Sequence, residues 1–169
     1  MSLSIYDITV PALLRGFDVL DYYMDRAAEA AEAGGYDPVI LVNARLYPDM
    51  IALAGQIQRA SDTAKASIGR LTGLEVPSFA DTETSLPELK GRIAKTAEFI
   101  RGVPKAAFAD SEGREIEIKF RAGAVTYTGI SYALEFMLPN FYFHVTTAHD
   151  ILRHNGVKVG KANYLGRFA

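Results

Sequence analysis

Four long stretches of this chain carry apolar residues at alternating three- and four-residue steps, a spacing that places them on one face of an α-helix. The most regular stretch has Pro48 in its predicted first turn and ends at Gly73. Asp62 lies opposite its apolar face and is expected to be solvated. The apolar face itself consists of Leu46, Met50, Leu53, Ile57, Ala60, Ala64, Ile68 and Leu71.

The first helical stretch is predicted to end at Gly34 and Gly35, but its start is open. Pro11 suits a first turn capped by Thr9, whereas Ile5 and its neighbours could extend the helix toward the N-terminus. Its apolar face consists of Val10, Leu13, Phe17, Leu20, Met24, Ala27 and Ala31.

The third stretch begins with a capping box formed by Ser85 and Glu88 and ends at Gly102. The last helix is predicted from Pro139 to about Arg153. Residues 132–138 are apolar and could form a separate short helix before it.

Between the third and fourth helices the apolar period changes from helical to alternating. Residues 115–121 alternate strictly, which predicts a half-buried strand, and Ala122-Gly123 is a turn after which residues 124–128 can return as a second strand. A lone hairpin is marginally stable, so it must lie on the helices or pair with a partner. We therefore predict a mainly all-α fold, a single-domain four-helix bundle over residues 1–169 with this hairpin inserted between the third and fourth helices.

Composition narrows the functional classes. The chain has 169 residues, a net charge of -2 and no cysteine, which excludes disulfides and thiolate sites and gives no basic field for nucleic acid. We find neither a signal peptide nor an apolar run of about 20 residues that could span a membrane. We expect a cytoplasmic protein that binds neither nucleic acid nor membrane.

All three histidines fall between Phe141 and Gly156. With a rotation of roughly 100° per residue, His144 points toward the bundle, while His149 and His154 point in two other directions. Their spacings of five and five prevent one intact helix from bringing all three rings to one ion. A metal site would need His144 together with ligands such as Asp49 or Gln56 from the second helix.

The aromatic run from Phe141 to Phe143 places rings on every side of the last helix. One ring faces the core, and the others require a cover such as the hairpin, residues 132–138 or a second subunit. We therefore predict a homodimer.

Three blocks of the chain resemble the bacterial family known as domain of unknown function 1993, namely Arg45–Met50, Gln56–Asp62 and Phe141–Gly156 followed by Gly160–Gly166. That family is grouped with the DinB and YfiT-like proteins, so the resemblance implies a DinB-like four-helix bundle and a possible metalloenzyme. The wider group implies a metal site with one histidine from the second helix and two from the fourth. Here the second helix has no histidine, and the position four residues after His144 is Ala148.

Three functions remain open. The first is a DinB-like bundle without an intact three-histidine site and without a cofactor, which acts as a small-molecule binding or interaction protein. The second is a metal-dependent hydrolase or thiol-dependent transferase that uses His144 in a substituted ligand set holding zinc or nickel. The third is a metal-free site in which His144 acts as a base. The residues predicted to line the pocket are His144, Asp49, Gln56, Tyr127, Thr147, His149, Arg153 and His154.

Overall fold

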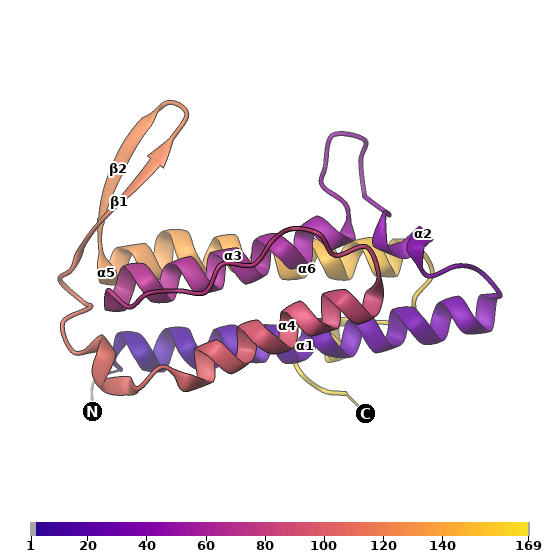
Figure 1. Ribbon diagram of the computed structural model, residues 1–169, viewed down its shortest axis with the longest axis horizontal. Coiled ribbons are helices and arrows are strands. Elements are labelled where there is room, and N and C mark those ends of the chain that lie inside the picture. Colours follow the sequence, from indigo (N-terminus) through magenta and orange to yellow (C-terminus); the bar gives the residue numbers. More distant parts are fainter. Residues whose placement is uncertain (1–2, 169) are drawn as a thin grey trace.

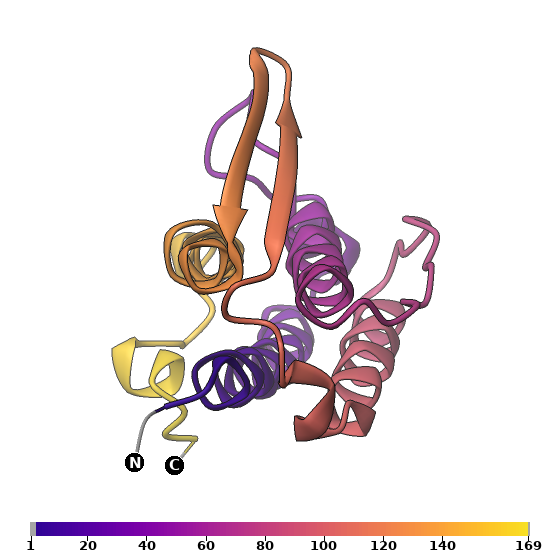
Figure 2. The ribbon, with the colours of Figure 1, turned by 90° about the vertical axis from the view of Figure 1, so that its left-hand side faces the viewer.

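The computed structural model describes residues 3–168 and consists of four long helices that pack side by side (Figure 1). These are α1 (Ile5–Gly34), α3 (Leu53–Thr72), α4 (Leu86–Gly102) and α6 (Leu138–His154). Around the bundle, α1 contacts α4, α4 contacts α3, α3 contacts α6, and α6 closes the ring against α1 (Figure 2). The predicted four-helix bundle with an inserted hairpin is confirmed.

The smaller elements lie at the ends of the bundle. A two-stranded hairpin separates α4 from α6, and α7 follows α6 near the C-terminus. None of the helices in residues 3–168 is long and apolar enough to cross a membrane. The smaller elements are α2 (Val39–Val42), η1 (Lys105–Phe108), β1 (Glu115–Phe120), β2 (Gly123–Thr128), α5 (Gly129–Ser131), η2 (Tyr132–Met137) and α7 (Lys161–Tyr164).

Helix caps set most of the boundaries. Ser4 precedes α1 and forms a capping box with Asp7, so the helix begins at Ile5 and Pro11 lies inside it. The same arrangement of Ser85 and Glu88 begins α4, as predicted. Gly35 and Gly73 adopt the left-handed conformation that ends α1 and α3, also as predicted.

The predicted start of the second long helix is wrong. Residues 43–52 form a loop, and α3 begins only at Leu53, after an extended Ala52. The Leu53 amide donates to the carbonyl of Ala44 at 2.9 Å, which closes this loop. Leu46 is exposed rather than part of the helical face, because the loop leaves the bundle (Figure 1). Leu46 and Met50 match the three- and four-residue spacing of the helical face by chance, although they lie in the loop.

The segment before the last helix also differs from the prediction. Instead of a separate short helix, α5, η2 and α6 follow one another without a break, and η2 is a π-helical segment. Pro139 stands at the start of α6 and has no N–H to donate to the preceding turn. The wider π turn accommodates this missing donor inside a continuous helix.

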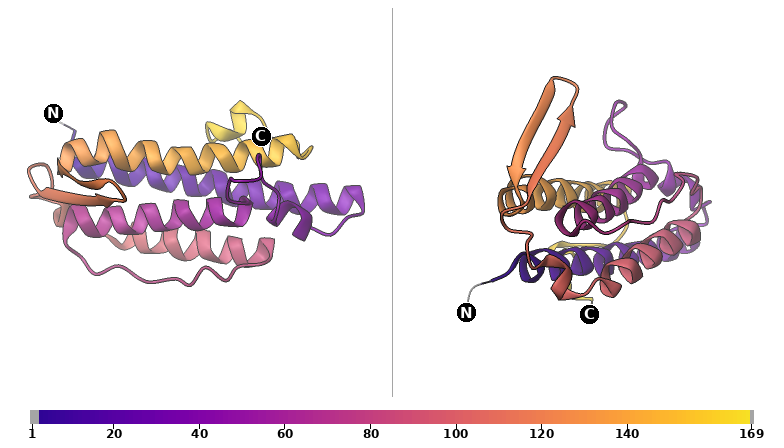
Figure 3. Two further views of the ribbon diagram at one scale, coloured as in Figure 1. Left: turned by 90° about the horizontal axis from the view of Figure 1, so that it is seen from above. Right: turned by 60° about the vertical axis from the view of Figure 1, so that its left-hand side comes forward.

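A long connection from residue 73 to residue 85 returns along the bundle, so α3 and α4 run in the same direction (Figures 1 and 3). The buried Arg92 of α4 anchors this connection to the bundle through ion pairs. Its guanidinium bonds to the carboxylates of Asp62, Asp81 and Glu83 at 2.8 to 3.0 Å. Asp62, expected to be solvated, is therefore a partner of a buried charge.

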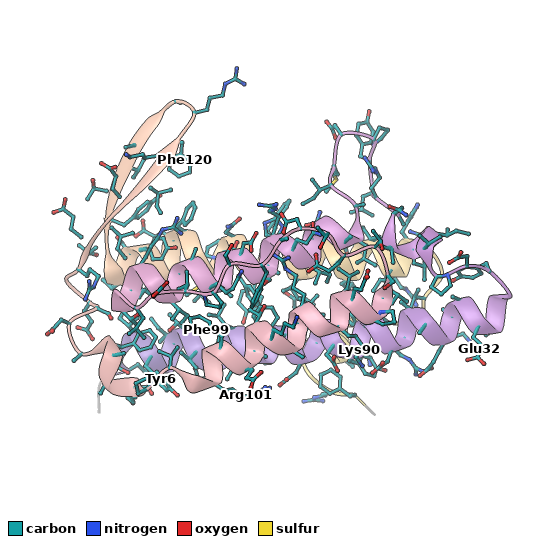
Figure 4. The ribbon with its side chains drawn as sticks, in the orientation of Figure 1. Tyr6, Glu32, Lys90, Phe99, Arg101 and Phe120 are labelled. Atoms are coloured by element: carbon teal, nitrogen blue, oxygen red, sulfur yellow. The ribbon has the colours of Figure 1, made fainter. Side chains whose placement is uncertain are left out.

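Removal of this guanidinium should destabilise the fold. Arg92→Ala leaves three carboxylates without their shared cation, and because these carboxylates are partly exposed we expect a loss of about 2 to 3 kcal/mol in the free energy of unfolding. Arg101→Ala on the same helix is the matched control, since Arg101 and Asp18 form an exposed pair at 3.5 Å (Figure 4) that contributes at most about 0.5 kcal/mol. Urea unfolding measures both values, and equal losses would contradict the anchoring role.

The core between α1 and α6 contains a close helix contact. The ring of Phe141 is fully buried and lies over Gly16, where an added Cβ would stand 2.3 Å from a ring carbon. Tyr142 is half-buried, and its hydroxyl accepts a hydrogen bond from Arg15 at 2.7 Å. Only Phe143 of the aromatic run is strongly exposed. Phe141 faces the core as predicted, and the prediction that Tyr142 needs an external cover is wrong. That a second subunit covers Phe143 stays a prediction.

Substitution of two helical glycines should have opposite effects. Gly16→Ala forces its methyl group into the Phe141 ring and is expected to cost about 1 to 3 kcal/mol. Gly91→Ala in α4 meets nothing within 4 Å and should stabilise the protein by about 0.5 to 1 kcal/mol through its better helix propensity. Thermal and urea unfolding of the two variants test this, and a stabilised Gly16→Ala would show that the helices can separate at low cost.

The hairpin has the predicted strands but a turn displaced by one residue. β1 and β2 pair from Glu115 with Thr128 to Phe120 with Gly123, so the loop is Arg121-Ala122 rather than Ala122-Gly123. The base of the hairpin packs on the helices at one end of the bundle, and its tip projects beyond them (Figures 1 and 3).

Candidate functional site

The candidate site lies where α3 packs against α6. Gln56 occupies the first turn of α3 and is buried, and His144 occupies the second turn of α6 and is half-buried. One turn earlier on α6, Asn140 donates a hydrogen bond to Thr63 of α3 at 3.0 Å. The two helices are thus joined by two polar pairs along one edge of their interface.

The hydrogen bonds of Gln56 fix the protonation of the His144 ring. The Gln56 amide Nε2 donates to the Ile51 carbonyl at 3.3 Å, so its Oε1 faces Nδ1 of His144 at 2.8 Å. Since Oε1 can only accept, Nδ1 must carry the proton. His144 Nε2 is then left with a lone pair, and among the described residues it has no hydrogen-bond partner and is not enclosed.

His144 is neutral at physiological pH. Burial of the ring, together with the positive charge of Arg59, lowers the pKa of His144 from 6.5 to about 4. The exposed ring of Phe143 lies beside it, with ring centroids 5.4 Å apart. The site therefore presents a neutral acceptor nitrogen next to an uncovered aromatic ring and a cation.

His149 forms a separate pair on the other side of α6. Its Nδ1 lies 2.6 Å from the hydroxyl of Tyr23, a fully buried residue of α1. Burial lowers the pKa of His149 and raises the pKa of Tyr23, so both groups are uncharged. Tyr164 of α7 covers the ring edge-on, with centroids 6.0 Å apart.

The remaining residues predicted for the pocket do not join His144. Asp49 lies in the exposed loop before α3 and not on the helix, because the helix starts later than predicted. Thr147 is buried and donates to the Phe143 carbonyl of its own helix. Tyr127 packs against Tyr132 of η2. Two further candidates, Arg153 and His154, lie exposed at the end of α6.

The donor set at this site does not fit a three-histidine metal centre. The second long helix lacks the histidine that the family resemblance implies, and the side-chain oxygen of Gln56, which faces His144 from this helix, is already bonded to it. Ala148, at the other implied position, is fully buried in the apolar core. Within residues 3–168, no three or more His, Cys, Asp or Glu side chains gather closely enough to hold an ion.

Some functional contacts had no clear signal in the sequence. The helical angle placed His144 toward the bundle, but neither Tyr23 nor Thr63 was identified as a partner of α6. Asn140 could have been found, because it lies one turn before His144 on the same helix face. Arg92 could not, since an arginine in the middle of an amphipathic helix is usually solvated.

Acidification should destabilise the protein through His144. The pKa of this ring is about 4 in the fold and 6.5 in its absence. The unfolded chain therefore takes up the proton first, and stability falls as pH decreases from about 6.5 to about 4. Because the ring is partly exposed, we expect the free energy of unfolding to fall by about 1 to 2 kcal/mol. This is less than the fall that the whole pKa difference would give. Urea unfolding of the wild type and of His144→Gln over this range checks this, and an equal loss in both proteins would contradict it.

Comparisons with known proteins agree with this fold. The sequence model of the family described as "Domain of unknown function (DUF1993)" matches residues 5–165. A crystal structure of a DinB family member protein from Shewanella denitrificans is 41% identical, with a TM-score of 0.88 over 95% of this chain and 91% of that chain. No curated protein matches the sequence. The resemblance to a DinB-like family is confirmed.

Proposed function

This chain belongs to the DUF1993 family, and we propose that it is a DinB-like binding protein whose site works without a metal ion. The observation that carries this proposal is the hydrogen bond between His144 Nδ1 and Gln56 Oε1. It commits the amide oxygen of Gln56 to His144, and it holds the imidazole as a fixed neutral acceptor.

The donor chemistry supports a metal-independent role. A protein site for a transition metal supplies about three ligands, and an amide oxygen is a weak ligand for such ions. At the α3–α6 interface only Nε2 of His144 remains available. Asp49, the carboxylate considered for a substituted set, lies in the exposed loop of residues 43–52.

The basicity of His144 favours binding over acid-base catalysis. An efficient general base has a pKa near the working pH, and a pKa of about 4 makes the imidazole a much weaker proton acceptor than an ordinary histidine. A hydrogen-bond acceptor needs only the lone pair. His144 is therefore suited to hold an N–H or O–H of a ligand without removing its proton.

The surroundings define the class of ligand. Phe143, 56% exposed, offers an aromatic surface beside the acceptor, and stacking on such a ring contributes about 0.5 to 1.5 kcal/mol. Arg59 is close enough to lower the pKa of His144, but its guanidinium is already paired with Asp81. A planar, neutral small molecule that carries a hydrogen-bond donor matches these features.

The alternative is a metal-dependent hydrolase or thiol-dependent transferase built on His144. The observation in its favour is the accessible lone pair on Nε2, since a metal ion could bind there. That ion would need its other ligands from outside the α3–α6 interface or from solvent.

Metal titration separates the two proposals. Calorimetry of tag-free protein with Zn²⁺ and with Ni²⁺ should show no site tighter than about 100 μM, because one imidazole gives a weak complex. His144→Gln is the control variant that removes the nitrogen ligand. One equivalent bound far more tightly by the wild type, and lost in the variant, would overturn the metal-free proposal in favour of the alternative.

A ligand screen tests the binding role directly. Small planar donors should shift the imidazole resonances of His144 in the wild type, and their affinity should fall about tenfold in His144→Phe, which keeps the aromatic surface but loses the acceptor. Ligands that bind equally to both proteins would count against His144 as the anchoring group.

A further inference from the structure

The hairpin has strand edges that its own chain does not pair. β1 and β2 pair only with each other within residues 3–168, and they project beyond the helices (Figures 1 and 2). An isolated two-stranded hairpin is marginally stable, and a third strand or a packed face is needed to hold it. Unpaired strand edges also present free N–H and C=O groups to other chains.

One face of the hairpin packs against η2, where Phe120 and Tyr127 both contact Phe136. Ile116 and Ile118 of β1 are 4% and 7% exposed, because the base of the hairpin lies against the helical segment before α6. Toward the tip, Phe120 is 45% exposed (Figure 4) although its ring lies edge-on to Phe136 of η2. Val125, which pairs with Ile118, is also 45% exposed. The apolar face is thus covered least toward the tip.

The charges of β1 follow an ordered gradient. Glu115 and Glu117 lie near the base, whereas Lys119 lies near the tip and Arg121 in the turn. All four side chains are exposed, and Glu117 and Lys119 form only a long pair at 3.6 Å within the strand. A strand with acids at one end and bases at the other complements an antiparallel copy of itself.

We propose that β1 pairs with β1 of a second copy of this chain, antiparallel and centred on Ile118. In this register Glu117 faces the partner's Lys119, and Glu115 faces the partner's Arg121. Ile116 faces the partner's Phe120, and Ile118 meets its own equivalent at the twofold axis. The contact is isologous, so each favourable pair occurs twice.

The sequence of β1 selects this register over its neighbours. A slip of one residue puts charged side chains opposite apolar ones. A slip of two residues centres the pair on Glu117 or on Lys119, which places two like charges directly opposite each other, and such pairs are destabilising. β2 has no charged residue between Gly123 and Thr128 to set a register. The β1 edge is therefore the self-complementary one.

The paired arrangement gives the free edge of β1 a partner. Two hairpins give a four-stranded sheet, which meets the requirement for at least three strands. Directly opposite residues of an antiparallel pair lie on the same face, so both apolar faces point to one side. The half-exposed Phe120 then lies beside the packed base of the partner's hairpin. This inference is independent of the role assigned to His144.

Charge exchange tests the proposal. Sedimentation velocity from about 1 to 100 μM should show a dimer of the wild type. Glu117→Lys and Lys119→Glu each place like charges at two positions and should weaken the dimer about tenfold or more. The double variant carrying both changes restores opposite charges and should return to near wild-type association. Glu98→Lys, an exposed change of equal charge on α4, should leave the dimer unaffected.

The distance between two spin labels, one in each copy, locates the contact. Since the chain has no cysteine, Ala122→Cys gives one label in each hairpin turn. Antiparallel pairing about Ile118 separates the two turns by eight residue steps, or about 26 Å along the strands. Three results of the sedimentation experiment would each overturn the proposal. They are a wild-type monomer at 100 μM, single variants that dimerise normally, and a double variant that stays dissociated. Circular dichroism confirms that every variant is folded.

Discussion

The contact of Phe141 with Gly16 determines how the last helix sits in the bundle. Because glycine has no side chain at this point, α6 can approach α1 closely and place the whole ring of Phe141 in the core. The depth and rotation of α6 then direct His144 toward α3 and His149 toward α1. Both histidine pairs thus depend on one helix contact that involves neither histidine.

The sequence predicted most of the fold because the relevant signals are local. Capping boxes and left-handed glycines lie within a few residues of the boundaries that they set, and the helical faces repeat over several turns. The start of α3 was predicted wrongly because Leu46 and Met50 continue the apolar spacing by chance. The bond between the Leu53 amide and Ala44 that ends the loop has no local signal.

The site was less predictable because its contacts join distant segments. The helical angle correctly turned His144 inward, and Gln56 was chosen as a neighbour from the geometry of its own helix. The Ile51 carbonyl accepts from Nε2 of Gln56 and so turns the amide oxygen toward Nδ1 of His144. Ile51 lies in the loop that we predicted as helix, so the sequence did not predict this arrangement. The buried Arg92 has its partners on α3 and in the long return connection, so its burial depends on the assembled bundle.

The two histidine pairs have opposite tautomers, and this difference leaves an accessible acceptor nitrogen on only one of them. The hydroxyl of Tyr23 is buried and has no other hydrogen-bond partner among the described residues, so its proton must go to Nδ1 of His149. The proton of His149 is therefore on Nε2. His144 has the reverse arrangement, because Gln56 accepts from Nδ1 and leaves Nε2 as an acceptor. Of two neutral imidazoles on one helix, His149 thus uses its lone pair to accept from the buried Tyr23, and the lone pair of His144 has no hydrogen-bond partner among the described residues.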